Sequence, residues 1–272
     1  MKNQDPEALT ALRRMTGPFV LRRLKKDVLR ELPGKEERIV YSAASGRQQK
    51  LYTASALKLK EALAGGAWSG NGKLEVLSQL MRLRQICCDP ALCFEDYTGE
   101  SAKLETCVSL IASASAAGHK ILLFSQFASM LERIRERLLQ EGILSHLLVG
   151  ATPKEERSRM VQAFASDEVP VFLISLKAGG TGLNLTAADI VIHYDPWWNV
   201  AAQNQATDRA YRIGQEKPVT VYKLILKDTI EENLLKLQNA KLALAAQVVS
   251  EGMVSLGDLS QNELMELFEQ NP

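Results

Sequence analysis

Residues 120–127 read K-I-L-L-F-S-Q-F. The four consecutive apolar residues Ile121–Phe124, followed at once by polar residues, predict a short strand that is buried on both faces. Comparable apolar runs follow at Leu144–Val149, Val171–Ile174, Ile190–His193 and Val219–Leu226. Segments with helical periodicity alternate with these runs, at residues 102–117, 127–141, 153–166, 200–211 and 229–247. This alternation predicts an α/β fold in which helices cover both faces of a parallel sheet.

Upstream of this region the sequence changes character. The elements expected there are one or two short helices broken at Gly17-Pro18, a strand, and a hairpin of two helices, at residues 5–30, 36–43, 46–64 and 73–88 respectively. A short acidic helix is expected at 256–270, near the C-terminus. We therefore expect three units: an entry segment with the helical hairpin (1–98), the α/β lobe (99–248) and a C-terminal bracing helix (249–272).

The loop between the two hairpin helices reads G-G-A-W-S-G-N-G-K and resembles a phosphate-binding P-loop at first glance. The pattern G-x-x-x-x-G-K-[ST] fails, because Ala67 stands where the first glycine belongs and Leu74 replaces Ser/Thr. An acidic box of the Asp-Glu-x-His type is also missing from the sequence. The chain alone is therefore not expected to hydrolyse a nucleoside triphosphate.

The composition is that of an ordinary globular protein, with 272 residues, 46% hydrophobic and 24% charged. No apolar run reaches membrane-spanning length, and the polar start is not a secretory signal. Cys87, Cys88 and Cys93 lie close together, but no Cys-x-x-Cys pair or nearby histidine completes a zinc site. The net charge is +1, yet residues 13–30 hold a basic surplus that suits either phosphate backbones or an acidic neighbouring domain.

Polar groups follow four of the predicted strands, where a parallel sheet binds its ligands. They are Ser125-Gln126, Gly150-Ala151-Thr152, Lys177-Ala178-Gly179-Gly180 and Asp195-Pro196-Trp197-Trp198. The side chains of Ser125, Gln126 and Thr152 suit a phosphodiester backbone held without reading of its sequence. For Ser125 taken alone a helix N-cap is the better account. The glycines of the third group permit close approach of a ligand, or form only a tight turn.

Residues 203–215 read Q-N-Q-A-T-D-R-A-Y-R-I-G-Q. On a helix, Arg209 and Arg212 would share one face, which Gln205 extends. Two guanidiniums on one face fork onto phosphate oxygens and suit a nucleoside triphosphate during its cleavage. The alternative is a solvated helix face on which Asp208 and Arg212 form a surface ion pair.

Taken together, these segments resemble the second RecA-like lobe of the Swi/Snf family of DNA-dependent ATPases, within helicase superfamily two. The resemblance covers nearly the whole chain, and its most specific runs are G-G-T-G-L-N-L at 179–185 and D-P-W-W-N at 195–199. K-I-L-L-F-S-Q-F, L-V-G-A-T-P at 148–153 and R-I-G-Q at 212–215 match in the same order, as does R-L-R-Q-I-C-C-D-P at 82–90 upstream. Two positions depart from the family pattern: Val200 replaces a proline, and Tyr211 stands where histidine is frequent.

The resemblance implies a RecA-like fold in which the helical hairpin is a protrusion of the lobe. It implies ATP and Mg²⁺ as cofactors, both held mainly by an N-terminal lobe that is absent from this sequence. Arg209 and Arg212 would act as catalytic arginine fingers on the γ-phosphate, with Gln205 and Gly180 on the nucleotide side. The chain would then be one lobe of a longer protein, cytoplasmic and nucleoid-associated in a prokaryote or nuclear in a eukaryote.

The resemblance also implies double-stranded DNA as a partner, bound without sequence preference. The residues expected to contact DNA are Ser125, Gln126, Thr152, Ser175, Lys177, Thr181 and Trp198. Trp198 is the second of two adjacent tryptophans in a loop, where both rings cannot easily be buried, although packing of both under the loop remains an alternative. A non-catalytic nucleic-acid-binding or protein-interaction module with the same fold is the competing function, and an RNA helicase lobe is disfavoured by the Trp-Trp-Asn and Arg-Ile-Gly-Gln runs.

Overall fold

The protein is described by a computed structural model that covers residues 32–44, 46–66, 72–176, 178 and 182–247, together with Met15; the side chains of 240–247 are not described. The predicted short helices within residues 5–30, their basic side chains and the bracing helix at 249–272 lie outside the described residues. Within the described part, no helix is long and apolar enough to span a membrane. The same part contains no group of three or more His, Cys, Asp or Glu residues that could hold a metal ion.

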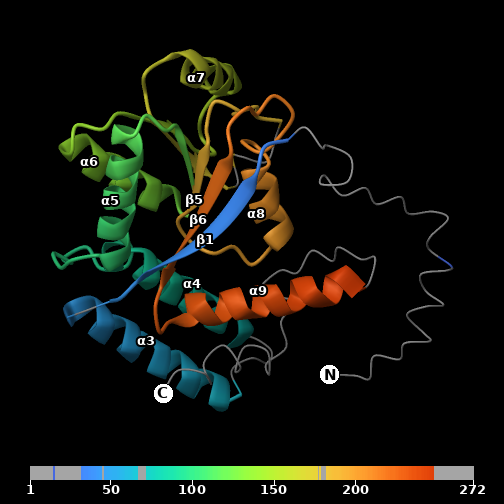
Figure 1. Cartoon of the computed structure of the whole chain (residues 1–272). Helices are drawn as coiled ribbons and strands as arrows, with labels where there is room; N and C mark the ends of the chain where they lie inside the picture. Colours follow the sequence, from blue (N-terminus) through green and yellow to red (C-terminus); the bar gives the residue numbers. More distant parts are fainter. Residues whose placement is uncertain are drawn as a thin grey trace.

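A six-stranded parallel sheet forms the centre of the molecule, with strand order β1-β6-β5-β2-β4-β3 (Figure 1). Its strands are β1 (Lys35–Ser42), β2 (Ile121–Ser125), β3 (Ser145–Leu148), β4 (Val171–Ser175), β5 (Ile190–His193) and β6 (Val219–Leu226). The predicted α/β class is confirmed. Strand β1 pairs with β6 along its whole length, so the sheet is completed by a segment from upstream of the helical hairpin.

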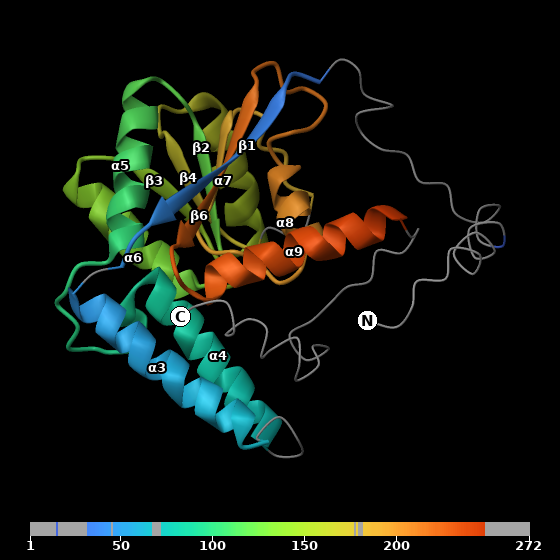
Figure 2. The same cartoon turned by 60° about the horizontal axis from the view of Figure 1, so that its bottom comes forward.

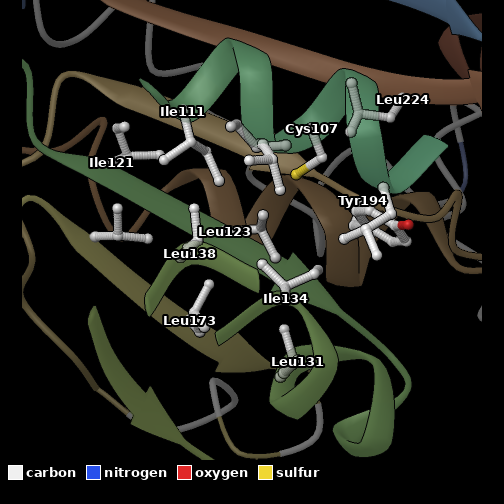
Figure 3. Close-up of a cluster of buried hydrophobic side chains, with 14 of the residues drawn as sticks. Cys107, Ile111, Ile121, Leu123, Leu131, Ile134, Leu138, Leu173, Tyr194 and Leu224 are labelled. Atoms are coloured by element: carbon white, nitrogen blue, oxygen red, sulfur yellow. The ribbon is translucent and has the colours of Figure 1, made fainter. Parts of the chain in front are cut away.

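Helices cover both faces of the sheet. They are α5 (Ala102–Ala116), α6 (Ala128–Gln140), α7 (Lys154–Ser166), α8 (Val200–Thr207) and α9 (Ile230–Gln247). Helices α5 and α6 cover one face, where Leu123 and Leu173 contact Ile111 and Ile134 in one buried cluster (Figure 3). On the other face Leu122, like its strand neighbour Phe124, belongs to the cluster that includes residues of α7 and α8. Alternate residues of each central strand therefore point into opposite cores, which explains its unbroken apolar sequence.

The predicted helical hairpin is present as α3 (Gly46–Ala64) and α4 (Gly72–Cys88), followed by the short 3-10 helix η1 (Pro90–Leu92). The pair projects from one end of the sheet (Figure 2). Leu59, Leu80 and Leu83 form its buried interface, which Leu226 and Ile230 extend to the end of β6 and the start of α9. The C-terminal half of α4 therefore belongs to the body of the lobe, and not only to the projection.

Helix α8 is shorter than the pattern predicts, because it ends at Thr207 and not near residue 211. The N–H groups of Arg209 and Ala210 bond three residues back, to Ala206 and Thr207, as in a tight turn. The side chain of Thr207 lies 2.9 Å from Nε2 of the buried His193, which fixes the helix end against β5. The prediction that Arg209 and Arg212 share a regular helix face is thus wrong, since both lie in the turn that follows the helix.

Candidate functional site

The carboxyl ends of four neighbouring strands, β5, β2, β4 and β3, bring most of the predicted site residues to one edge of the sheet. Ser125 and Ser175 are direct partners in the pairing of β2 with β4. Gln126 follows β2, Trp198 lies in the loop after β5, and Thr152 follows β3. The prediction that these segments converge is confirmed by the strand order.

Ser125 and Ser175 serve these loops from inside the protein. The hydroxyl of the fully buried Ser125 donates to Oδ1 of Asp195 over 2.5 Å and accepts from the N–H of Phe127 at 3.1 Å. The hydroxyl of Ser175, also buried, accepts from the N–H of Ala178 at 3.3 Å. In this conformation both hydroxyls are covered and bonded within the protein, so neither is presented to a DNA phosphate, and the predicted contacts stay predictions. The two serines hold the loops in place instead.

Thr152 closes the turn after β3. Its hydroxyl accepts from the N–H of Val149 at 3.1 Å. Arg157 of α7 reaches back to the same turn and donates to the carbonyl oxygens of Thr152 and Gly150 at 2.8 and 2.9 Å. Thr152 is half-buried, so part of its surface remains accessible. The role of Arg157 was not predicted, because nothing in the sequence marks which helix returns to this turn.

Lys177, Gly180 and Thr181 lie outside the described residues. The loop that contains them begins after the buried Ser175 and ends at Gly182, which has the positive φ of 55° that favours glycine. Their predicted contacts with DNA and nucleotide therefore stay predictions.

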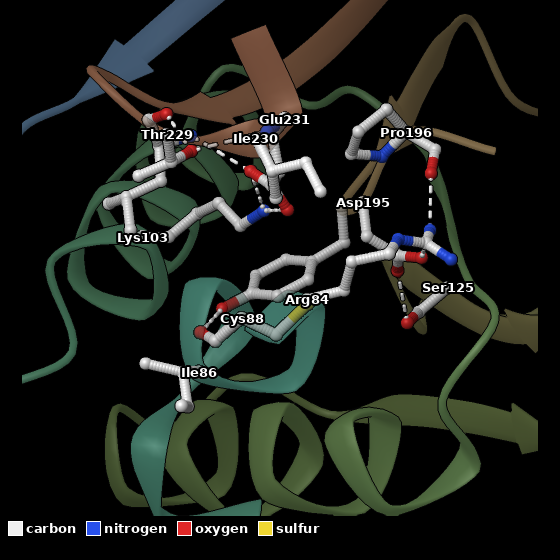
Figure 4. Close-up of polar contacts among 12 residues, drawn as sticks. Arg84, Ile86, Cys88, Lys103, Ser125, Asp195, Pro196, Thr229, Ile230 and Glu231 are labelled. Atoms are coloured by element: carbon white, nitrogen blue, oxygen red, sulfur yellow. Dashed lines mark hydrogen bonds and ion pairs between the residues drawn. The ribbon is translucent and has the colours of Figure 1, made fainter. Parts of the chain in front are cut away.

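Arg84 of α4 is a central residue of this edge that sequence reasoning missed. Its side chain is 1% exposed. Nη1 donates to Oε1 of Gln126 at 2.9 Å. Nη2 donates to the carbonyl oxygen of Pro196 at 2.6 Å (Figure 4). The guanidinium carbon lies 5.5 Å from the ring centre of Trp198. Arg84 belongs to the segment R-L-R-Q-I-C-C-D-P, but the sequence does not indicate which of its arginines points inward.

Asp195 balances the charge of Arg84 at the end of β5. Its Oδ2 lies 3.7 Å from Nη2 of Arg84, and both side chains are 1% exposed. Burial raises the pKa of Asp195, while Arg84 and the hydrogen bond from Ser125 act in the opposite direction. The N–H of Gln126 also lies within 3.3 and 3.4 Å of the two carboxylate oxygens. One buried carboxylate thus connects α4, the end of β2 and the end of β5.

Trp198 is only partly buried, and its ring packs against the cluster between α3, α4 and α9. Its neighbour Trp197 is fixed by its backbone: the N–H donates to Oε1 of Gln203 at 3.3 Å, and the carbonyl oxygen accepts from the side chain of Gln238. The exposed part of Trp198 leaves a surface for a ligand, while the rest of the ring is packed. The ring of Trp198 is thus packed in part, as the alternative expects, while its predicted contact with DNA stays a prediction.

The two predicted catalytic arginines lie beside residues 183–185, which follow the glycine loop. The N–H of Leu185 donates to the carbonyl oxygen of Arg209 at 3.0 Å, and Nη1 of Arg212 donates to the carbonyl oxygen of Leu183 at 3.3 Å. Burial lowers the pKa of Arg209, the positive charge of Arg212 lowers it further, and Asp208 acts in the opposite direction. Arg209 is 8% exposed and Arg212 is half-buried, so two guanidiniums that repel each other here favour the binding of an anion between or beside them.

Gln215 holds the arginine turn in place and was also missed as a site residue. Its Nε2 lies 3.1, 2.8 and 3.2 Å from the carbonyl oxygens of Thr186, Ala188 and Ala210, and its Oε1 accepts from the N–H of Lys217 at 2.9 Å. The side chain is 6% exposed. By contrast Gln205, predicted on the nucleotide side, lies exposed on α8. The exposed Gln205 is open to a ligand, whereas the buried Gln215 holds backbone groups in place.

Comparison with known proteins identifies two adjacent domain families in the chain. Residues 102–214 match the helicase conserved C-terminal domain, and residues 1–92 match the SNF2-related domain. The chain is 39% identical, over 98% of its length, to an "Uncharacterized ATP-dependent helicase MG018" from Mycoplasma genitalium. It spans 26% of that relative, about a quarter of its length.

Two solved structures share the fold. The C-terminal domain of the Sulfolobus solfataricus SWI2/SNF2 ATPase is 31% identical, with a TM-score of 0.70 over 88% of this chain and 100% of that one. The core of the Sulfolobus solfataricus SWI2/SNF2 ATPase in complex with double-stranded DNA is 33% identical, with a TM-score of 0.72 over 98% of this chain and 57% of that one. The likeness thus covers both the helical hairpin and the sheet.

Proposed function

The chain belongs to the SWI2/SNF2 family of ATPases, and we propose that it is the C-terminal motor lobe of an ATP-dependent double-stranded-DNA translocase or nucleoprotein remodeller. The observation that carries this proposal is the arginine turn. The backbone carbonyl of Arg209 and the side chain of Arg212 bond Leu185 and Leu183, which follow the glycine loop directly and lie more than twenty positions earlier in the chain. The two arginines therefore lie beside the segment that follows the glycine loop, where we place the γ-phosphate.

On the nucleotide side, Arg209 and Arg212 contact the γ-phosphate of ATP and stabilise the charge that develops on it during cleavage. Gln205 and Gly180 contribute to the same surface. The N-terminal lobe supplies the P-loop lysine and the carboxylates that hold Mg²⁺. The chain alone should then show no ATPase activity above background, with or without DNA.

On the DNA side, the strand-end loops form part of a track for the duplex. Gln126, Thr152 and the exposed part of Trp198 lie at its surface, and Lys177 and Thr181 extend it. Amide and hydroxyl groups at this position contact the sugar-phosphate backbone and do not read sequence. Closing of the two lobes on ATP and reopening after hydrolysis would then move the lobes along one strand.

The alternative function is a binding module that keeps the fold but not the motor activity. The pair Arg209 and Arg212 argues against it, because a module that only binds DNA has no use for two adjacent like charges that are partly removed from solvent. Burial and the positive charge of Arg212 both lower the pKa of Arg209, so the charged form of Arg209 is disfavoured in that arrangement. A γ-phosphate compensates for it during turnover.

The test uses the complete protein with both lobes. Arg209→Ala and Arg212→Ala should lower turnover by about 10³–10⁵-fold, the contribution of an arginine finger. Duplex affinity should stay nearly unchanged, and Arg→Lys should not restore turnover, since an ammonium lacks the planar fork. Arg135→Ala is the matched control, because Arg135 is exposed on α6, on the other face of the sheet. Near-normal turnover in the Arg209 and Arg212 variants, or an equal loss of DNA binding, would refute the assignment.

A further inference from the structure

We propose that Arg84 is a positioning residue for DNA: it fixes the orientation of Trp198 and Gln126 at the strand ends and couples them to the helical pair α3–α4. This inference rests on the proposed DNA-binding function of that edge. It concerns a residue that contacts neither DNA nor nucleotide itself, because its side chain is 1% exposed.

The contacts of Arg84 reach three parts of the protein that are far apart in sequence. From α4, its guanidinium bonds the Gln126 side chain after β2 and the Pro196 carbonyl after β5, 42 and 112 positions away. It lies 5.5 Å from the ring centre of Trp198, a distance at which a cation is attracted to the face of an indole. A single guanidinium therefore connects the two side chains expected to meet DNA on this edge.

The chemistry of the guanidinium fixes which end of Gln126 faces inward. Arginine has donors only, so Gln126 must present its carbonyl oxygen to Nη1, and its amide nitrogen must point elsewhere. That nitrogen, Nε2, is buried without a hydrogen-bond partner in the described part of the protein. Turning the amide over would place its nitrogen against Nη1, donor against donor, so Arg84 fixes this orientation although it leaves Nε2 without a partner.

Trp198 shows the same feature. Its ring lies over the guanidinium, and its Nε1 is another buried donor that lacks a partner among the described residues. Both nitrogens are donors, and a phosphate oxygen, which only accepts hydrogen bonds, is a partner that suits either of them. Both nitrogens are covered in the DNA-free structure, so we expect contact to come with a local shift of the loop after β5.

Asp195 neutralises the charge of Arg84 inside the protein, so the cluster is stable and is not a general anion-binding site. Its carboxylate lies 3.7 Å from Nη2 and also receives the hydroxyl of Ser125 and the N–H of Gln126. The charge of Arg84 is thus balanced inside the protein. Arg84 therefore affects the surface through the orientation of Gln126 and Trp198, and not through its own charge. This distinguishes a positioning role from direct phosphate binding.

The experiment compares Arg84→Lys and Arg84→Met with Lys103→Met in this chain. Lys103 is the matched control, since it is equally buried and ion-paired at the base of the helical pair, but pairs with Glu231 instead. The first measurement is the indole N–H signal of Trp198 in ¹H–¹⁵N spectra. The chain has three tryptophans, and Trp198→Phe assigns the signal. The second is affinity for a labelled 20-base-pair duplex by fluorescence anisotropy.

We expect both Arg84 variants to move the Trp198 signal and to weaken duplex binding about five- to tenfold, the lower range for loss of one base- or backbone-contacting aromatic. Lys103→Met should change the Trp198 signal and the duplex affinity less than the Arg84 variants do, even where it lowers stability to the same degree. The double variant Arg84→Lys/Gln126→Leu should bind the duplex little more weakly than Arg84→Lys alone, because Arg84 and Gln126 act as one unit. If Arg84→Met fails to fold, Arg84→Lys and Gln126→Leu provide the same comparison.

Two results would overturn the proposal: an unmoved Trp198 signal with affinity within twofold of the wild type, or equal effects from Lys103→Met. Failure of the proposed function gives a different pattern. The wild-type chain would then not bind the duplex at all, and the Trp198 signal alone would decide whether Arg84 positions the ring. A signal that moves in both Arg84 variants but not in Lys103→Met would still support the positioning role.

Discussion

The ammonium of Lys103 lies 2.6 and 2.7 Å from the two carboxylate oxygens of Glu231, and both side chains are completely buried. The pair joins α5 to the first turn of α9, 128 positions later (Figure 4). Glu231 Oε2 also accepts from the N–H of Leu226 at 2.9 Å, so the end of β6 is part of the same contact. This ion pair fixes α9 where it leaves the sheet.

Removal of one partner should leave the other charge buried and unpaired. We expect Lys103→Met or Glu231→Gln to lower the free energy of unfolding by about 3–5 kcal/mol. The double variant Lys103→Met/Glu231→Leu should regain most of that loss, because it removes both charges and fills their volume. Urea unfolding followed by circular dichroism measures all three. Additive losses in the double variant would contradict this account.

A second prediction concerns acid. His193 is buried between Phe124 and Thr207, and burial lowers its pKa from 6.5 to about 3, with Lys223 acting in the same direction. The folded state therefore binds fewer protons than the unfolded state between these values. Its contribution to stability is complete above pH 6.5 and is lost as the pH falls toward 3, at roughly 1.4 kcal/mol per pH unit.

The window from pH 6.5 to 4.5 separates this effect from that of Glu37. The pKa of Glu37 is lowered from 4.5 to about 2 by Lys223 and Lys35 against the effect of burial, so its contribution is lost only below pH 4.5. His193→Gln keeps a polar side chain of similar size but does not titrate. The wild-type free energy of unfolding should fall more steeply than that of His193→Gln across this window. Parallel curves would show that His193 does not titrate as its burial requires.

Much of the fold follows from local sequence. The apolar run at Ile121–Phe124 and the later runs predicted the central strands to within a residue or two, because a strand buried on both faces has few alternatives. The two hairpin helices were predicted for a similar reason. What failed was the end of α8, which is set by contacts of Thr207 with His193 and by the anchoring of Gln215. Neither contact has a local signal.

The site was predictable only in part for the same physical reason. Residues at strand ends could be listed from the pattern, but whether a side chain points into the protein depends on partners elsewhere in the chain. Ser125 was assigned to the surface and is buried on Asp195, 70 positions away. Arg84 was not singled out, although it contacts Gln126 and Pro196. A buried polar residue is identified by its partners, and these come only with the fold.

The isolated chain should bind duplex DNA weakly and without sequence preference. One lobe is expected to offer only a few phosphate contacts, so we expect a Kd of roughly 10⁻⁴–10⁻⁶ M at physiological salt. Affinity should fall as salt rises, because each contact releases counterions. Anisotropy titrations at several salt concentrations, with duplexes of unrelated sequence, measure both properties. Tight binding that ignores salt and prefers one sequence would contradict the proposed track.

The last prediction compares two glutamines ten positions apart. Gln215 is buried with its Nε2 on three carbonyl oxygens beside the arginine turn, whereas Gln205 is exposed on α8. Gln215→Glu should be harmful although it keeps the shape, because a carboxylate cannot donate to carbonyl groups. We expect it to lower the free energy of unfolding by about 1–3 kcal/mol. Turnover of the complete protein should also fall, since Arg209 and Arg212 lose their fixed positions.

Gln205→Ala should leave stability unchanged and lower turnover only through weaker nucleotide contact. Measurement of unfolding in urea together with kcat and KM for ATP separates the two roles. Normal turnover in Gln215→Glu at full stability would mean that the arginine turn needs no such support, and a loss of stability in Gln205→Ala would mean that Gln205 is structural after all.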